Sequence, residues 1–297
     1  MGLTKHTNCQ VCDSTDIIDV SILKDHSHTG ETFPIVKCGN CDFHFTQNIP
    51  DAASIGTYYQ SENYVSHSDT QKGLFFKVYH IVRDYMLKKK KKLVINSTGK
   101  KTGKLLDIGT GTGYFSNTMI QAGWKVQGIE QDPETRNYAA SKFNFQVHDT
   151  PTLYNLPDEY FDAITMWHVL EHVHDLKGYL KKIHSLLADN GTFVVAVPNH
   201  TSFDADYYKS FWAAWDIPIH LWHFNPSTMK KLMEENHFKL VNLKPMPFDA
   251  AYVSMLSEQY SSGKKLPGLF KGIKFALKGK FNPEKCSSVT YVMKKKA

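Results

Sequence analysis

Residues 105–115, which read LLDIGTGTGYF, constrain the fold of this chain more than any other segment. An apolar run ends at Asp107, and Gly109, Gly111 and Gly113 follow at alternate positions. This pattern is typical of a buried parallel strand that turns sharply into a helix, with glycines where a side chain would block an approaching ligand. The segment therefore predicts a loop that holds a nucleotide-like molecule.

The spacing of the glycines indicates which class of nucleotide the loop accepts. A dinucleotide-binding fold uses G-x-G-x-x-G, and its helix N-terminus faces a pyrophosphate. Here the spacing is G-x-G-x-G, and Asp107 precedes it. We expect Asp107 to direct a negative charge toward the pocket, which suits the sulfonium and ammonium groups of S-adenosylmethionine. The same spacing disfavours a nicotinamide-dependent dehydrogenase.

The segments after the loop alternate between helix and strand. A helical stretch at 114–122 precedes the apolar strand WKVQGIEQD, which ends at Glu130, where a carboxylate can bind both ribose hydroxyls. Residues 161–173 predict a strand that runs into a loop, and residues 191–199 predict the next strand. This alternation predicts an α/β fold with a parallel sheet covered by helices on both faces.

In this order, the glycine loop, Glu130 and the two later strands resemble the class I S-adenosylmethionine-dependent methyltransferases, closely over residues 104–199. The resemblance implies a Rossmann-like sheet with one antiparallel strand, closed by residues 237–246 and 288–295. It also implies that the cofactor contacts lie in the loop and at strand ends: Asp107, Gly109, Thr110, Gly111, Gly113, Tyr114, Phe115, Glu130, Gln131, Trp167 and His168.

The segment FDAITMWHVLEHV contains a histidine-rich element of its own. His168, Glu171 and His172 are similar to the "HxLEH" element of many small-molecule methyltransferases. We expect the two histidines to orient the cofactor or cap a helix. For Glu171, either holding a histidine tautomer or capping the following helix is open, and we favour the cap.

Four of the five cysteines form two pairs, Cys9 with Cys12 and Cys38 with Cys41. Each pair has the spacing with which two thiolates bind a tetrahedral zinc ion, and four thiolates leave no position for water. Disulfides are the poorer explanation in a reducing compartment. We therefore expect one structural zinc in a ribbon-like module, and simple burial for Cys286.

The length of 297 residues favours a core domain with a smaller accessory unit. We expect the zinc-ribbon-like module at 1–48, a helical connector at 49–99, and a methyltransferase domain at 100–297 with insertions at 200–225 and 247–286. The connector helix is expected to end in the solvated lysine run 88–92. Tyr58, Tyr59 and Tyr64 either form a flap over the site or pack between domains.

Neither composition nor hydropathy points to a membrane-spanning or secreted protein. No apolar run reaches the roughly 20 residues that a bilayer span needs, and the N-terminus lacks a secretory apolar stretch. We therefore expect a cytoplasmic protein without a transmembrane segment. The net charge of +6 is a mild bias that does not establish nucleic-acid binding.

Aromatic residues are concentrated in and just after the first insertion. We call residues 201–226 the aromatic insertion. It holds Tyr207, Tyr208, Trp212, Trp215, His220, Trp222 and His223. The stretch PIHLWHF resembles a "PxHLxxF" segment of related enzymes. Because ligands bind at the carboxyl ends of parallel strands, we expect the acceptor pocket here. His220 and His223 are the candidate catalytic bases, since a histidine pKa lies near the working pH.

Residues 264–281 combine regularly spaced apolar residues with six lysines. This segment predicts a basic amphipathic helix that either contacts a membrane surface, covers a lipid-like substrate, or packs on the core with its lysines in water.

Together these features predict S-adenosylmethionine-dependent methyl transfer to a small-molecule acceptor, such as a sugar nucleotide or a cell-envelope or lipid precursor. Sugar-modifying methyltransferases with a similar zinc module also carry paired tyrosines after the second cysteine pair. One alternative is a zinc-ribbon rRNA methyltransferase, although residues 1–48 contain few basic residues among aromatics. Another is a partner-binding protein without turnover, against which the intact glycines, Asp107 and Glu130 argue.

Overall fold

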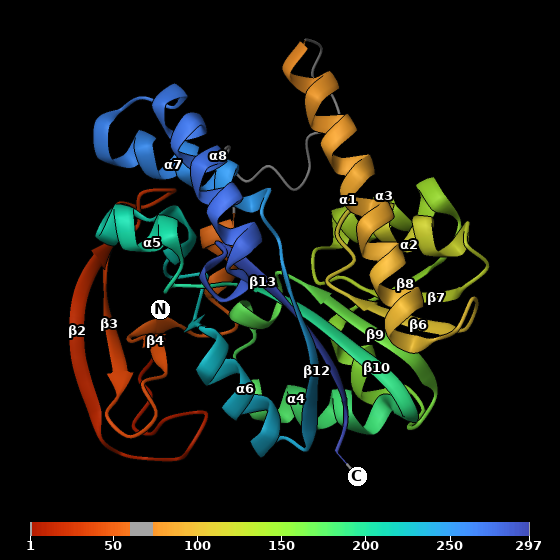
Figure 1. The fold of residues 1–297 in the computed structure, drawn as a ribbon. Coiled ribbons are helices and arrows are strands. Elements are labelled where there is room, and N and C mark those ends of the chain that lie inside the picture. The colour runs from red at the N-terminus through yellow and green to blue at the C-terminus, as the bar shows by residue number, and fades with distance from the viewer. Residues whose placement is uncertain (1, 60–73, 297) are drawn as a thin grey trace. The chain divides into compact units, whose positions relative to one another are not determined.

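A computed structural model describes residues 2–59 and 74–296 (Figure 1). The expectations for Tyr64 and for the rest of the 60–73 connector lie outside these residues. Internal contacts divide the chain into two compact units. Unit one comprises Met1–Asn63, His168–Tyr179 and Ala196–Tyr291, and unit two comprises Tyr64–Trp167, Leu180–Val195 and Val292–Ala297. The predicted domain boundaries at 48 and 99 remain predictions.

The largest sheet has seven strands in the order β12-β13-β10-β9-β6-β7-β8. Its strands are β6 Lys104–Ile108, β7 Lys125–Ile129, β8 Gln146–His148, β9 Phe161–Trp167, β10 Leu187–Pro198, β12 Phe238–Pro245 and β13 Ser288–Lys295. Strand β6 pairs in parallel with both β7 and β9, and β7 pairs in parallel with β8. Strands β6 and β9 are buried on both faces, and their pairing confirms the predicted parallel core.

Strand β13 runs against its two neighbours. Just past the end of β10, the Asn199 amide donates to the Ser287 carbonyl, and just past the end of β12, the Met246 amide donates to the Ser288 carbonyl. The carboxyl ends of β10 and β12 therefore lie beside the start of β13, which is antiparallel to both. This confirms the predicted closing pair and the Rossmann-like sheet with one antiparallel strand.

Unit two contains the helices that follow and precede the parallel strands: α1 Leu74–Thr98, α2 Tyr114–Ile120 and α3 Pro133–Phe143, with a short 3-10 helix at Thr150–Asn155. Val94 on α1 packs with Phe115, Met119, Leu105 and Val194 in one buried cluster. Helix α1 continues to Thr98, so the expectation that it ends in the lysine run was wrong. Lys90 is half-buried and its ammonium lies 4.3 Å from the centre of the Trp167 ring, so this lysine is not a solvated helix end.

Unit one is built around a four-stranded sheet in the order β11-β4-β3-β2. The strands β2 Ile17–Lys24, β3 Thr32–Cys38 and β4 His44–Thr46 come from the cysteine-rich segment, and β11 Trp222–His223 comes from the aromatic insertion. Trp222 pairs with Phe45 and His223 with His44 in antiparallel register. A separate pair joins β1 Leu3–Thr4 to β5 Ile49–Pro50. The aromatic insertion is thus an integral strand of the N-terminal sheet.

The remaining elements of the described chain are mainly helical. They are the 3-10 helices Ile55–Tyr59, Leu170–His172, Lys209–Phe211, Ala213–Trp215 and Pro283–Lys285, and the α-helices α4 Leu176–Leu186, α5 Phe203–Tyr208, α6 Pro226–Glu235, α7 Asp249–Ser262 and α8 Leu266–Phe281. Helix α6 starts in a capping box of Asn225 and Thr228 and has Pro226 at its first position. Helices α7 and α8 lie side by side (Figure 1).

Trp222 anchors β11 in an aromatic core. Its ring centre lies 6.0 Å from that of Phe43 and 6.1 Å from that of Phe45, and its indole N–H donates to the Val173 carbonyl at 2.6 Å. Because Trp222 is only 1% exposed, removal of the ring would leave a cavity and an unpaired carbonyl.

We expect Trp222→Ala to destabilise the protein by about 3–5 kcal/mol, the usual cost of removing a buried aromatic ring. Thermal unfolding followed by circular dichroism would measure the change. Phe211→Ala is the matched control, because Phe211 belongs to the same insertion but is 39% exposed, so its melting temperature should stay near that of the wild type. Equal melting temperatures for both variants would contradict the role given to Trp222.

Candidate functional site

The glycine loop after β6 has the backbone that its sequence predicts. Gly109, Gly111 and Gly113 have φ values of 71°, 55° and 81°, in the left-handed region that favours glycine. A Cβ added at Gly111 would meet no atom within 4 Å, so the space above this residue is open. A Cβ at Gly113 would lie 3.0 Å from Ala139, so this glycine instead lets the start of α2 approach α3. Gly111 is therefore the position at which a ligand can approach the backbone.

Asp107 lies beneath the loop, and the structure corrects the expected direction of its side chain. One carboxylate oxygen accepts a hydrogen bond from Ser116 at 2.6 Å, and the other accepts one from Thr165 at 2.7 Å. The residue is 1% exposed, and burial raises the pKa of its carboxyl group to about 6. Asp107 thus ties the loop to α2 and β9 from inside the fold.

Glu130 follows β7, the strand next to β6. The two strand ends are level, because Ile108 is paired with Ile129. The carboxylate accepts hydrogen bonds from the Gly111 amide at 2.8 Å and the Asp132 amide at 3.0 Å. This places an acidic side chain beside the open glycine, where ribose hydroxyls would compete for the same oxygens.

The other predicted cofactor residues of unit two surround this loop. The Thr110 hydroxyl donates to the Asp107 carbonyl at 2.8 Å, and the Tyr114 hydroxyl accepts from the Lys142 ammonium at 2.8 Å. Phe115 is buried against Trp167, with ring centres 5.3 Å apart, whereas Gln131 is exposed. Thr110 and Phe115 are buried and therefore support the loop from the interior of the fold.

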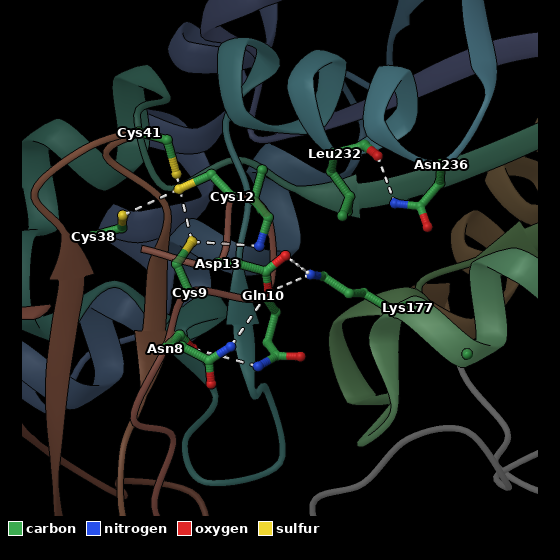
Figure 2. A network of polar contacts seen from close by, with 12 residues as sticks. Asn8, Cys9, Gln10, Cys12, Asp13, Cys38, Cys41, Lys177, Leu232 and Asn236 are labelled. Carbon is green, nitrogen blue, oxygen red and sulfur yellow. Dashed lines mark hydrogen bonds and ion pairs between the residues drawn. The ribbon is translucent and has the colours of Figure 1, made fainter. Parts of the chain in front are cut away.

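The four paired cysteines converge in unit one (Figure 2). The sulfur atoms of Cys9 and Cys41 are 3.5 Å apart, and those of Cys12 and Cys38 are 3.6 Å apart. Four sulfurs at the Zn–S bond length of about 2.3 Å in a tetrahedron would be about 3.8 Å from one another, whereas a disulfide is far shorter. Amide N–H groups of Val11 and Asn40 point to two of the sulfurs. The arrangement fits a closed four-sulfur metal site.

A small pocket in unit one is lined by residues of the aromatic insertion and of the turn after β2. Its walls include Trp212, Trp215, Asp216, Tyr260 and His26. The His26 ring is stacked on Tyr260 with ring centres 5.0 Å apart. The pocket has aromatic walls and two carboxylates, those of the buried Asp25 and the half-buried Asp216, and burial raises the pKa of Asp216 to about 6.

Two of the predicted tyrosines differ in their surroundings. Tyr58 is buried with Leu23 and Phe33, and its hydroxyl donates to Glu31 at 2.6 Å, so it packs within the N-terminal segment. The Tyr59 hydroxyl lies 3.1 Å from His172 Nδ1. Tyr59 therefore touches the histidine cluster described next, whereas Tyr58 does not.

Glu171, His172 and His220 form a compact cluster in which Glu171 is fully buried. One ligand atom from each residue lies within 4.8 Å of the other two, so their charges are coupled. The Nδ1 atom of His172 lies 2.9 Å from the Ile219 carbonyl, and that of His220 lies 2.9 Å from the Ala214 carbonyl. Carbonyls only accept, so both Nδ1 atoms carry the proton and both Nε2 atoms present a lone pair.

The charges in this cluster follow from burial. Burial and the neighbouring His220 lower the pKa of His172 to about 4, and burial lowers the pKa of His220. Neither oxygen of the fully buried Glu171 has a hydrogen-bond partner within the described residues. The expectation that Glu171 caps the following helix was wrong, because Asp175 accepts the Gly178 amide there at 2.9 Å.

His168 is the charged member of the group. Its Nδ1 lies 3.4 Å from Glu171 and its Nε2 lies 3.1 Å from Asp249. Burial opposes the charge, but the two carboxylates outweigh it and raise the pKa of His168 to about 9. The His168 imidazolium therefore compensates the buried Glu171 charge from one side, while the neutral His172 and His220 lie on the other.

His223 has different surroundings from His220. Its Nε2 lies 2.9 Å from the Thr46 hydroxyl, and its ring contacts Trp215 edge-on with centres 4.8 Å apart. Burial lowers its pKa well below the usual value. Strand β11 thus holds His223 within the N-terminal sheet.

Sequence reasoning missed two carboxylates of this region. Asp216 Oδ2 lies 3.9 Å from His220 Nε2, and the spacing of four residues within an aromatic segment was a usable signal. Asp249 is far from His168 in the sequence and starts α7, so no local pattern predicts their contact.

Comparisons with known proteins identify relatives for much of the chain. A family described as "Methyltransferase domain" matches residues 79–243, more than half of the chain. A ubiquinone biosynthesis O-methyltransferase of Pelagibacter ubique is 28% identical over 188 residues, covering 57% of this chain and 73% of the relative. A demethylmenaquinone methyltransferase of Tropheryma whipplei is 31% identical over 113 residues, covering 36% of this chain and 47% of the relative.

Solved structures share the fold at low sequence identity. A Burkholderia thailandensis 1,6-didemethyltoxoflavin-N1-methyltransferase, solved with S-adenosylhomocysteine, has a TM-score of 0.51 and 15% identity, covering 92% of this chain and all of its own. A methyltransferase from Archaeoglobus fulgidus has a TM-score of 0.50 and 20% identity, covering 75% of this chain and all of its own.

Proposed function

Because the chain belongs to the methyltransferase domain family, as a class I S-adenosylmethionine-dependent methyltransferase, we propose that it methylates a small molecule bound against the aromatic insertion. The observation that carries this proposal is His220, whose unprotonated Nε2 lies 3.9 Å from Asp216 of the aromatic pocket, in the same cluster as the buried Glu171. We propose His220 as the proton acceptor. The acceptor is a sugar nucleotide or a cell-envelope or lipid precursor.

The residues divide the task in the following way. In unit two, Gly111 would give the cofactor access to the backbone, and Glu130 would accept hydrogen bonds from the ribose hydroxyls. Bound S-adenosylmethionine would supply an electrophilic methyl group to the nucleophilic acceptor and leave as S-adenosylhomocysteine. In unit one, His220 Nε2 takes the proton of the acceptor, and the resulting imidazolium is stabilised by Glu171 and by Asp216. His172 donates to Ile219 and holds its side of the cluster in place.

The relatives support a small-molecule acceptor, since their names are those of quinone-modifying methyltransferases. An rRNA acceptor is less well supported by the N-terminal sheet. Its outer strand β2 exposes Ile18, Val20 and Ile22 rather than the basic residues that bind phosphates.

The first test concerns the cofactor. We expect wild-type protein to bind S-adenosylhomocysteine in calorimetry, and Gly111→Val to abolish binding, because its side chain enters the open space and its backbone is strained at positive φ. Glu130→Ala should weaken binding strongly. The matched control is Gly99→Val, which also has positive φ and open space but lies after α1. Tight NAD binding without S-adenosylhomocysteine binding would overturn the assignment.

The second test concerns the base. Using radiolabelled S-adenosylmethionine with nucleotide-linked sugars and hydroxylated quinone precursors, we expect His220→Ala to lower kcat by about 10²–10⁴-fold while S-adenosylhomocysteine affinity is retained. The matched control is His223→Ala, because His223 is also a buried histidine, and its main effect should be a lower melting temperature. Full activity of His220→Ala would remove it from the mechanism.

The pH profile adds an independent readout for His220. Burial lowers the pKa of His220 below the usual 6.5. At any pH above 6.5 the ring is therefore neutral and able to accept a proton. We therefore expect kcat/KM of the wild type to fall only as the pH drops below about 6.5. An acid limb centred above this value would contradict His220 as the base.

We also propose that Cys9, Cys12, Cys38 and Cys41 hold one structural zinc ion, since their sulfur spacing fits a tetrahedron. Metal analysis should find about one zinc per chain, which Cys9→Ser/Cys12→Ser should lose together with part of its thermal stability. Cys286→Ser is the control, because Cys286 is buried elsewhere and should leave the zinc content unchanged. A metal-free wild type with the same melting temperature would refute this site.

A further inference from the structure

Helix α8 presents a row of large apolar side chains to solvent. Leu266, Phe270, Ile273, Leu277 and Phe281 are 65%, 65%, 47%, 57% and 84% exposed. Their spacing of three or four residues places all five on one side of the helix. We call this row the outer stripe. A contiguous apolar row of this length on a surface marks an interaction site rather than scattered exposure.

The outer stripe faces outward because the opposite side of α8 is committed to packing. Gly268, Gly272, Phe275 and Gly279 are the buried residues of this helix. A Cβ at Gly268 would lie 2.3 Å from the Ser254 carbonyl oxygen, and one at Gly272 would lie 2.6 Å from the Ala250 carbonyl oxygen, both on α7. Only glycine permits this approach, so the helix cannot rotate to bury its larger apolar residues. Of the placements that the sequence leaves open for 264–281, the structure shows a packed helix, but the packing uses the glycines and Phe275 and not the outer stripe.

Lysines border the outer stripe on both sides. At about 100° per residue, Lys274 lies on one edge of the stripe and Lys280 lies on the other. Both are exposed. Lys271 is turned further round and pairs with Glu258 on α7 at 2.8 Å, which adds to the packing of the two helices. The helix surface thus combines an apolar centre with cationic edges.

We propose that α8 docks on the surface of an anionic phospholipid bilayer, with the outer stripe among the acyl chains and the bordering lysines at the headgroup phosphates. Charge complementarity selects this occupant, because a purely apolar partner would leave the lysines without counter-charges. Across the described residues, no helix meets the length and hydropathy required to cross a bilayer, and α8 would lie in the plane of the interface. This inference does not depend on the identity of the methyl acceptor.

Vesicle co-sedimentation of the full chain tests the proposal, with phosphatidylglycerol vesicles compared against phosphatidylcholine vesicles. We expect binding to the anionic vesicles that weakens as salt is raised, because screening acts on the lysine contacts. Phe270→Ser/Leu277→Ser should lower the partition coefficient at least about tenfold by removing apolar contact. Lys274→Glu/Lys280→Glu should do the same by reversing two charges.

Matched controls come from β12 in the same unit. Val241→Ser removes an apolar side chain that is 57% exposed, and Lys239→Glu/Lys244→Glu reverses two exposed lysines, so neither should change vesicle binding. Circular dichroism would verify that every variant is folded, as expected for changes at exposed positions.

Three results would overturn the proposal. The first is a lack of sedimentation with phosphatidylglycerol vesicles at low salt, and the second is equal binding of wild type and Phe270→Ser/Leu277→Ser. The third is self-association of the wild type that Phe270→Ser/Leu277→Ser abolishes, while neither protein binds vesicles. The outer stripe would then be an interface between copies of the chain.

Discussion

The backbone pairing of β11 with β4 is the contact on which the arrangement of unit one depends. It brings residues from opposite ends of the sequence into one sheet, and the buried Trp222 holds the strand against Phe43 and Phe45. The Thr46 hydroxyl also donates to the His220 carbonyl at 2.8 Å. The backbone of the proposed base is therefore positioned by the cysteine-rich segment. Since Cys38 ends β3 and β4 follows it directly, a metal bound by the four cysteines would stabilise the sheet that carries His220.

Burial disfavours charge at all three imidazoles of this region, and nearby carboxylates outweigh it only at His168. Burial lowers the pKa values of His172 and His220, helped by His220 at His172 and by His168 at His220, whereas two carboxylates keep His168 charged. Glu171 lies between these groups without a hydrogen-bond partner in the described structure. The His168 imidazolium offsets part of the cost of burying the Glu171 charge. In the proposed mechanism, the same carboxylate would favour the protonated form of His220.

The sequence predicted those features that depend on local physical chemistry. The glycine loop and the parallel strands are set by neighbouring residues, and the structure has them where the patterns place them. The side-chain directions were harder to predict. Asp107 turns inward because Thr165, distant in sequence, supplies a hydrogen-bond donor, and His168 is charged because Asp249 starts a helix elsewhere in unit one. No spacing rule contains these contacts, since they arise only when the chain is folded.

Helix α8 shows how one apolar pattern allows two opposite placements. A row of residues such as Phe270, Ile273 and Leu277 has the same helical period whether it faces a core or solvent, so periodicity alone cannot separate the two. The deciding signal is the pair of Gly268 and Gly272, which permits an approach of α7 that no larger residue allows. Close packing of α7 against these glycines replaces the burial of large side chains as the force that fixes the helix. The apolar row is then left on the surface, where its contact with an apolar phase would stabilise an association instead of the fold.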